Sequence, residues 1–185
     1  RGIGGANAAG DKTAQQPPPD GARSVHVVAH KFGGSSLADA ERIRHVAGLL
    51  RSCQETTQVV VVSAMQGVTD ALIGLTAAAA GKAEWRPQWQ ALRDKHLAAA
   101  GELLGADAAP MLAWLGERFD ELSEKLHAIS VLGSAGREIA DGLSGKGEVW
   151  SAHLLHALMR AEGADYDLLD ARELLVVRHE ELGVA

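Results

Sequence analysis

Two glycines that follow a lysine-bearing apolar run are the residues of this 185-residue chain whose types and spacing most clearly suggest chemistry. The segment reads His30-Lys31-Phe32-Gly33-Gly34-Ser35-Ser36. Glycines let a backbone approach an anion without a Cβ atom in the way, and free N–H groups at the start of a helix favour negative charge. Lys31 adds a full positive charge. The pattern indicates a phosphate site, with an ordinary strand-to-helix turn as the alternative.

A phosphate site of this kind needs a strand before the glycines and a helix after them. The apolar run 25–29 predicts a buried strand, and the apolar stripe over 37–50 predicts an amphipathic helix with Ser36 as its N-cap. A second strand is predicted over 58–63. Its unbroken run of valines, Val59 to Val62, is typical of a strand buried on both faces of a parallel sheet. Strand, helix and strand together predict a βαβ unit.

A second polar loop, Ser63 to Asp70, follows the second predicted strand and enters a helix for which Thr69 is the expected cap. Ligands of α/β proteins bind at the carboxyl ends of parallel strands. Both turns should therefore open on the same edge of the sheet, which makes the hydroxyl groups of Ser63 and Thr69 candidates for ligand contacts.

The rest of the chain is predicted to be mostly helical. A helical hairpin is expected over about 85–132, and shorter helices over 134–143 and 150–161. The glycine-rich stretch between these last two predicts a loop, and it is no P-loop because Gly147 follows Lys146 where Ser or Thr is required. Two short strands are predicted, over 166–169 and 174–177.

Composition excludes several classes of function. A net charge of −6 argues against a surface for nucleic acid or for an anionic membrane. Cys53 is the single cysteine, so the chain can form no internal disulfide, which fits a cytoplasmic setting. No metal site is predicted from His153 and His156, because no third ligand accompanies them. Residues 1–23 are predicted to be a disordered leader, and residues 24–185 to form the folded domain.

Three stretches taken together resemble a known family. They are Lys31–Asp39, Val59–Asp70, and Gly147–Leu155 followed by Asp170-Ala171-Arg172. The chain resembles aspartate kinases of the amino-acid kinase superfamily, and most of all the kinase part of fused aspartokinase–homoserine dehydrogenases. The resemblance implies a three-layer α/β/α sandwich around a mostly parallel sheet, of which this chain would be the N-terminal portion with a helical insertion.

The resemblance also implies a reaction. Aspartate kinases transfer the γ-phosphoryl group of ATP, with Mg²⁺, to the side-chain carboxylate of L-aspartate. The product, 4-phospho-L-aspartate, leads to lysine, threonine and methionine. Lys31 resembles the lysine that stabilises the transferring group, and Gly33, Gly34 and Ser35 resemble the turn beside the ATP phosphates.

The remaining expected roles concern aspartate. Ser63 and Thr69 match positions that contact aspartate, and Glu148 matches the glutamate that receives its amino group. A homo-oligomer is expected for the full-length protein, and NADP would be needed only if a dehydrogenase domain followed. The family's later segments complete the site, so we expect this chain alone not to phosphorylate aspartate. The alternatives are another amino-acid kinase, acting on a different carboxylate, carbamate or phosphate, and a non-catalytic remnant or assembly module.

Overall fold

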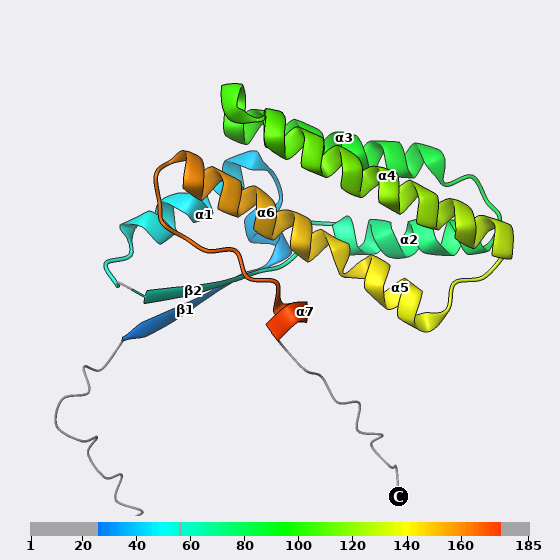
Figure 1. Ribbon diagram of the computed structural model, residues 1–185, viewed down its shortest axis with the longest axis horizontal. Coiled ribbons are helices and arrows are strands. Elements are labelled where there is room, and N and C mark those ends of the chain that lie inside the picture. Colours follow the sequence, from blue (N-terminus) through cyan, green and yellow to red (C-terminus); the bar gives the residue numbers. More distant parts are fainter. Residues whose placement is uncertain (1–25, 56, 175–185) are drawn as a thin grey trace, which may run out of the picture.

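The computed structural model describes residues 26–55 and 57–174, and Figure 1 shows how their elements are arranged. The leader expected over 1–23 and most of the strand expected over 174–177 lie outside this part. The elements, in chain order, are β1 (Val27–Phe32), the 3-10 helix η1 (Gly34–Leu37), α1 (Ala40–Ser52), β2 (Thr57–Val62), α2 (Val68–Ala80), α3 (Arg86–Leu104), the 3-10 helix η2 (Gly105–Asp107), α4 (Ala109–Leu132), α5 (Arg137–Ser144), α6 (Lys146–Ala161) and α7 (Ala171–Leu174).

The predicted βαβ unit is confirmed. Strands β1 and β2 are parallel and in register from Val27 opposite Thr57 to Phe32 opposite Val62, with α1 as the connection. One further hydrogen bond, from the Ser63 N–H to the Phe32 carbonyl at 2.9 Å, continues the pairing of the two segments just beyond the end of β2. The glycine turn and the Ser63 loop therefore leave the same edge of the sheet.

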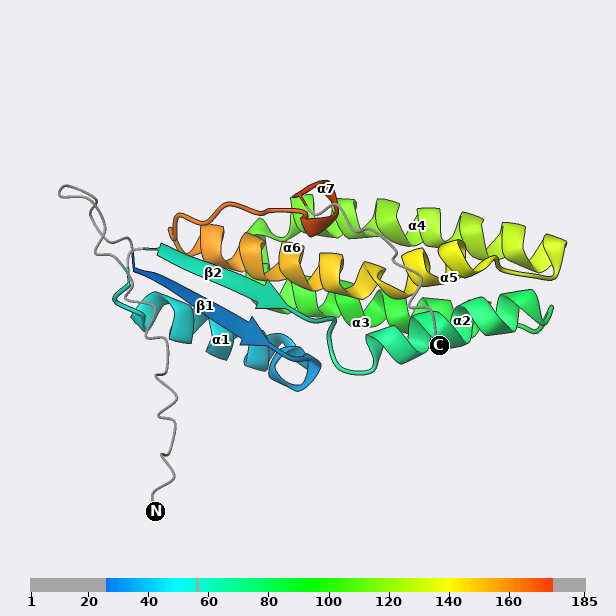
Figure 2. The same ribbon diagram turned by 90° about the horizontal axis from the view of Figure 1, so that it is seen from below.

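The helices of the described part cover one face of the sheet. In Figure 2 the two strands lie in front of α1, α3 and α6, and side-chain burial alternates along both strands. Val59 and Val61 are 49% and 53% exposed, whereas Val60 and Val62 pack against the core. The prediction that the valine run is buried on both faces is thus wrong for this part of the chain, because nothing in it covers the second face.

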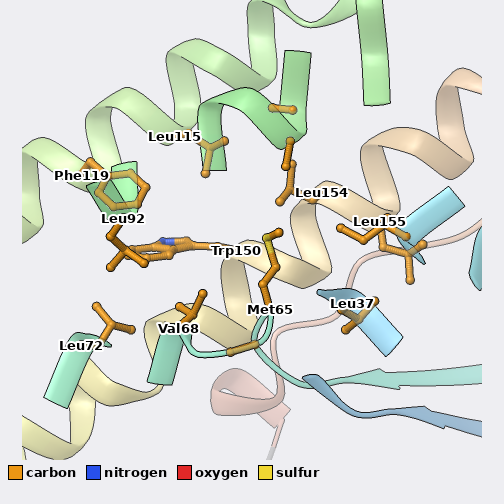
Figure 3. Packing of buried hydrophobic residues seen from close by; sticks show 14 of the residues in the cluster. Leu37, Met65, Val68, Leu72, Leu92, Leu115, Phe119, Trp150, Leu154 and Leu155 are labelled. Carbon is orange, nitrogen blue, oxygen red and sulfur yellow. The ribbon is translucent and has the colours of Figure 1, made fainter. Parts of the chain in front are cut away.

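The core lies between the helical hairpin, α6 and the first helices. The pair expected over about 85–132 is present as α3 and α4, and each begins with a proline in its first turn as predicted. Figure 3 shows Trp150 of α6 in the middle of this core, with Phe119 and Leu92 from the hairpin on one side and Met65 and Val68 on the other. Aromatic packing therefore ties α6 to both the hairpin and the loop that follows β2.

Two expected helix caps lie elsewhere. The Asp39 carboxylate, not Ser36, caps α1 by accepting a hydrogen bond from the Arg42 N–H at 2.9 Å. Ser36 is instead part of η1, where its N–H donates to the Gly33 carbonyl. Helix α2 begins after Gly67, whose φ of +77° suits glycine. Thr69 is thus the second residue of α2 rather than its cap.

Two further predictions are wrong. The glycine-rich stretch expected as a loop contains the start of α6, which begins at Lys146 and includes Glu148 in its first turn. Residues 166–169 form no strand, and the carbonyl of Tyr166 is hydrogen-bonded by His156 of α6 at 2.9 Å. That bond occupies an acceptor that a strand would offer to its neighbour.

A buried histidine in this core predicts a loss of stability in acid. His96 of α3 is fully buried between Phe119 and Trp150, and its Nδ1 lies 2.8 Å from the Leu92 carbonyl oxygen. Burial lowers the pKa of His96 from 6.5 to about 4. The unfolded chain thus binds the proton more tightly, so the free energy of unfolding should fall as the pH drops from about 6.5 to about 4. The full loss from this group is roughly 3 kcal/mol.

Urea denaturation at a series of pH values measures this effect. The control is His96→Leu, which removes the titrating group and keeps an apolar side chain. Other groups titrate in both proteins, so the difference between the two pH profiles isolates His96. Parallel profiles between pH 4 and 6.5 would contradict the prediction.

Candidate functional site

Five of the seven residues singled out from the sequence line one cleft at the carboxyl edge of the sheet. The cleft has a volume of about 280 Å³ and is formed by η1, the loop after β2, the start of α2 and the start of α6. The five predicted residues in its wall are Gly34, Ser35, Ser63, Thr69 and Glu148. Groups separated by more than a hundred positions in the sequence are therefore brought together.

Close backbone contact fixes one side of the cleft. A Cβ atom on Gly34 would lie 3.1 Å from the Ala64 carbonyl oxygen and 3.6 Å from the Gln66 Cα atom. The glycine turn after β1 and the loop after β2 thus pack against each other through their main chains. A larger residue at Gly34 would push these two walls apart.

A second glycine brings α6 to the same place. A Cβ atom on Gly147 would lie 2.7 Å from the Ala64 Cβ atom and 2.8 Å from the Val68 Cγ1 atom. Both separations are shorter than real Cβ contacts, so α6 can approach the loop this closely only with glycine at position 147. Glu148, the next residue, is carried into the cleft wall by that approach.

The cleft lies at the amino-terminal ends of two helices. Gly67 and Thr69 belong to the start of α2, and Glu148 belongs to the first turn of α6. Helix starts offer N–H groups without intrahelical partners and the positive end of the helix dipole, and both favour anions. The hydroxyl groups of Ser35, Ser63 and Thr69 add further donors. The cleft is therefore suited to a ligand that carries carboxylate or phosphate groups.

The exposed Asp70 is one exception to this preference for anions, and Glu148 is the other. Its side chain is half-buried, and its Oε2 atom is buried with no hydrogen-bond partner among the described residues. Buried polar atoms are rarely left without a partner, so one without any calls for an explanation such as a missing ligand. A carboxylate oxygen can only accept, and a ligand with a cationic donor would satisfy it.

Two predicted residues are not in the cleft wall. The side chain of Lys31 is exposed on the open face of the sheet, with Val61 as its neighbour across the strands. Gly33 is extended (φ −81°, ψ 173°), and nothing lies within 4 Å of the place where its Cβ would be. Both residues border the same edge of the sheet, and Lys31 shares with the exposed Val61 the face that the helices leave open (Figure 2).

The motif Asp170-Ala171-Arg172 also lies outside the cleft wall. The carboxylate of Asp170 accepts hydrogen bonds from the Nε and main-chain N–H groups of Arg172, each at 2.9 Å. These bonds from Arg172 lower the pKa of Asp170 to about 2. The motif therefore starts the short helix α7 and has no direct part in the cleft.

Several wall residues were not identified from the sequence: Ala64, Met65, Gln66, Gly67 and Asp70. They all belong to the stretch already recognised as a loop, and only the glycine with positive φ carries a local signal. Among the described residues, no three His, Cys, Asp or Glu side chains are grouped so that they could hold a metal ion.

A second hollow of about 280 Å³ lies between the α3–α4 turn and the end of α6. Its wall is mainly apolar, with Leu104, Met111 and Trp114 among its residues. Its wall carries no hydroxyl group, although it includes the start of α4. Of the two, only the cleft at the sheet edge combines hydroxyl donors with the starts of two helices.

Curated relatives share most of this chain. It is 37% identical over 150 residues to "Bifunctional aspartokinase/homoserine dehydrogenase 1, chloroplastic" of Arabidopsis thaliana, a match that covers 80% of this chain and 16% of the relative. It is 35% identical over 147 residues to "Bifunctional aspartokinase/homoserine dehydrogenase 2" of Escherichia coli K12, a match that covers 79% of this chain and 18% of the relative. The chain thus spans less than a fifth of the length of these relatives.

Solved structures share its fold. E. coli aspartokinase III in complex with aspartate and ADP matches with a TM-score of 0.65 and 24% identity, covering 75% of this chain and 30% of that one. The same enzyme in complex with lysine and aspartate matches with a TM-score of 0.66 and 22% identity. The α/β fold with a parallel sheet is thereby confirmed, and the described residues supply part of that sheet and one helical layer.

No helix in the described part of the chain is long and apolar enough to span a bilayer.

The model of the amino acid kinase family matches residues 26–182, which includes both strands, the hairpin and every residue of the cleft. Since that match extends over most of the sequence, the chain belongs to the amino acid kinase family.

Proposed function

We propose that this chain is part of an aspartate kinase, which transfers the γ-phosphoryl group of ATP to the side-chain carboxylate of L-aspartate and forms 4-phospho-L-aspartate. Its similarity to aspartokinases and its membership of the amino acid kinase family support the proposal. Because the chain spans only a small share of those relatives, the activity is proposed for the whole protein that contains it.

The observation that carries the proposal is the Glu148 carboxylate in a cleft that otherwise favours anions. Its buried Oε2 atom has no partner among the described residues, and two helix starts and three hydroxyl groups share the same wall. An amino acid with an acidic side chain presents one ammonium and two carboxylates, which matches this distribution. Glu148 would accept the ammonium, and Ser63 and Thr69 would donate to carboxylate oxygens.

The proposed reaction needs no general base from the protein. A carboxylate is ionised near neutral pH, so the nucleophile needs no deprotonation. The difficulty is to bring it to a polyanion, which requires positioning and positive potential. In the proposed arrangement Gly33, Gly34 and Ser35 border the ATP phosphates and Lys31 supplies the cation. Mg²⁺ would come with the nucleotide, since this ion is usually held by substrate phosphates with few protein ligands.

Replacing Glu148 by glutamine tests the assigned role. Glutamine keeps the shape and removes the charge, so the bond to the ammonium is weakened while the cleft keeps its form. In the natural full-length protein we expect the KM for aspartate to rise roughly 10- to 100-fold, and that for ATP to change far less. Formation of aspartyl hydroxamate from ATP, Mg²⁺, aspartate and hydroxylamine measures both constants.

A matched control is Glu138→Gln. Glu138 also lies in the first turn of a helix, α5, but it is exposed and outside the cleft wall. If Glu148 served only the helix dipole, both variants would lose about 0.3–1 kcal/mol of stability and neither would change the KM for aspartate. If the unaltered full-length protein forms no hydroxamate with aspartate, the proposed function itself is refuted.

Four finer points remain predictions. A homo-oligomer is expected for the full-length protein, and NADP would be needed only if that protein includes a dehydrogenase domain. The cytoplasmic setting expected from the single cysteine is tested by locating the protein in the cell, and a relative from Arabidopsis thaliana is named as chloroplastic. For the isolated chain we expect no acyl phosphate, which the same hydroxamate measurement tests.

A further inference from the structure

One lysine outside the family-like stretches is bonded to the loop that lines the cleft. Lys95 lies on α3, and its Nζ donates a hydrogen bond of 2.7 Å to the main-chain carbonyl of Gln66. Gln66 is a residue of the cleft wall, whereas Lys95 is not. The helical hairpin therefore holds the cleft loop from outside, through a contact between residues 29 positions apart.

The orientation of the next peptide group follows from this bond. A trans peptide is planar, with its C=O and N–H groups pointing in opposite directions. The described residues contain no cis peptide bond, so the N–H of Gly67 points away from Lys95. That N–H donates to no group in the described part of the chain, and Gly67 lines the cleft.

The surroundings of this peptide leave it little other support. Gln66 and Gly67 are both exposed. Gly67 has a positive φ, and a glycine can readily adopt other backbone conformations as well. The Gln66 atoms nearest to a Cβ placed on Gly34 are its main-chain N and Cα atoms. The charged bond from Lys95 is thus the one directional contact that the described residues make to the Gln66 carbonyl.

We propose that Lys95 is a positioning residue, which holds the Gln66–Gly67 peptide so that the Gly67 N–H can donate to an anionic group of the ligand in the cleft. In the aspartate kinase proposed above, on which the choice of ligand rests, that group is a carboxylate of aspartate. Lys95 contacts no substrate. It acts by limiting the loop to the conformation in which the donor faces the ligand.

The first test uses this chain and needs no activity. In Lys95→Met the amide signal of Gly67 in a ¹H–¹⁵N NMR spectrum should shift and broaden, and its hydrogen exchange should accelerate. Lys95→Arg keeps a cationic donor and should restore both properties. The control is Lys82→Met, an exposed lysine beyond the opposite end of α2 from the cleft, which should leave the Gly67 signal unchanged.

The second test uses the natural full-length protein. Lys95→Met should raise the KM for L-aspartate roughly 5- to 20-fold, with kcat and the KM for ATP changed less than twofold, and Lys95→Arg should recover most of the loss. An unchanged Gly67 amide in Lys95→Met would overturn the positioning role, whether or not the protein uses aspartate. A displaced amide with an unchanged KM for aspartate would overturn the role of this N–H in recognition. Failure of the unaltered protein to use aspartate would refute the proposed function, while the NMR result would still decide the role of Lys95.

Discussion

Replacing Trp150 by alanine is expected to reduce the free energy of unfolding by about 3–5 kcal/mol, the usual cost of removing a large buried aromatic side chain. Trp150 is 1% exposed and packs on Phe119, with ring centroids 4.5 Å apart, and on His96 at 5.0 Å. Figure 3 shows Met65 and Val68 of the cleft side against the same ring. The cavity would therefore open between α6, the hairpin and the cleft loop at once.

Urea denaturation followed by circular dichroism measures the loss. Trp114→Ala is the matched control, because Trp114 is only half-buried and stacks on His153 at the surface of α4 and α6. Its removal should lower the free energy of unfolding clearly less than Trp150→Ala does. Equal losses in the two variants, or a loss below about 1 kcal/mol for Trp150→Ala, would mean that the core does not depend on this residue.

The parts of the fold that the sequence predicted well are those governed by local patterns. Alternating or unbroken apolar runs gave the two parallel strands, and helical spacing gave the hairpin and α6. The first strand was predicted over 25–29, whereas β1 runs from Val27 to Phe32 and includes Lys31. On a sheet face that the helices leave open, a lysine is as acceptable as a valine, so the strand continues to Phe32.

The parts predicted wrongly were decided by contacts between distant residues. Glycine disfavours a helix interior, so the stretch around Gly147 was expected to be a loop. Close packing of Gly147 on Ala64 and Val68 outweighs that preference and allows α6 to begin at Lys146. Likewise, the bond from His156 to the Tyr166 carbonyl has no signature in the local sequence.

The candidate site shows the same division. Its polar residues were identified from motifs, and the cleft that gathers five of them depends on two glycine contacts that only the folded chain reveals. Lys95 could not have been identified, because its partner Gln66 is 29 positions away and the hairpin carries no recognised motif. The assignment of roles to these residues stays a prediction that the variants test.

Lys31→Ala is the second change with a large expected effect. In the natural full-length protein it should lower turnover about 10²–10³-fold, equivalent to ~3–4 kcal/mol of transition-state stabilisation by one preorganised charged contact. Lys31 lies next to the carboxyl end of β1, directly before the turn at Gly33, and no described residue forms an ion pair or hydrogen bond with its ammonium group. Its charge is therefore available to a ligand.

The position of Lys31 gives this prediction a structural consequence. Its side chain lies on the open face of the sheet while the cleft lies at the carboxyl edge, so we expect a phosphoryl group that contacts both to lie over Gly33 and Gly34. An exposed strand residue contributes little to folding, and Lys31→Ala should change stability by less than about 0.5 kcal/mol. Lys31→Arg should retain part of the activity, because it keeps the charge but changes the shape of the donor. Near-normal turnover in Lys31→Ala would remove Lys31 from the phosphate site, and a large loss of stability would show that its role is structural.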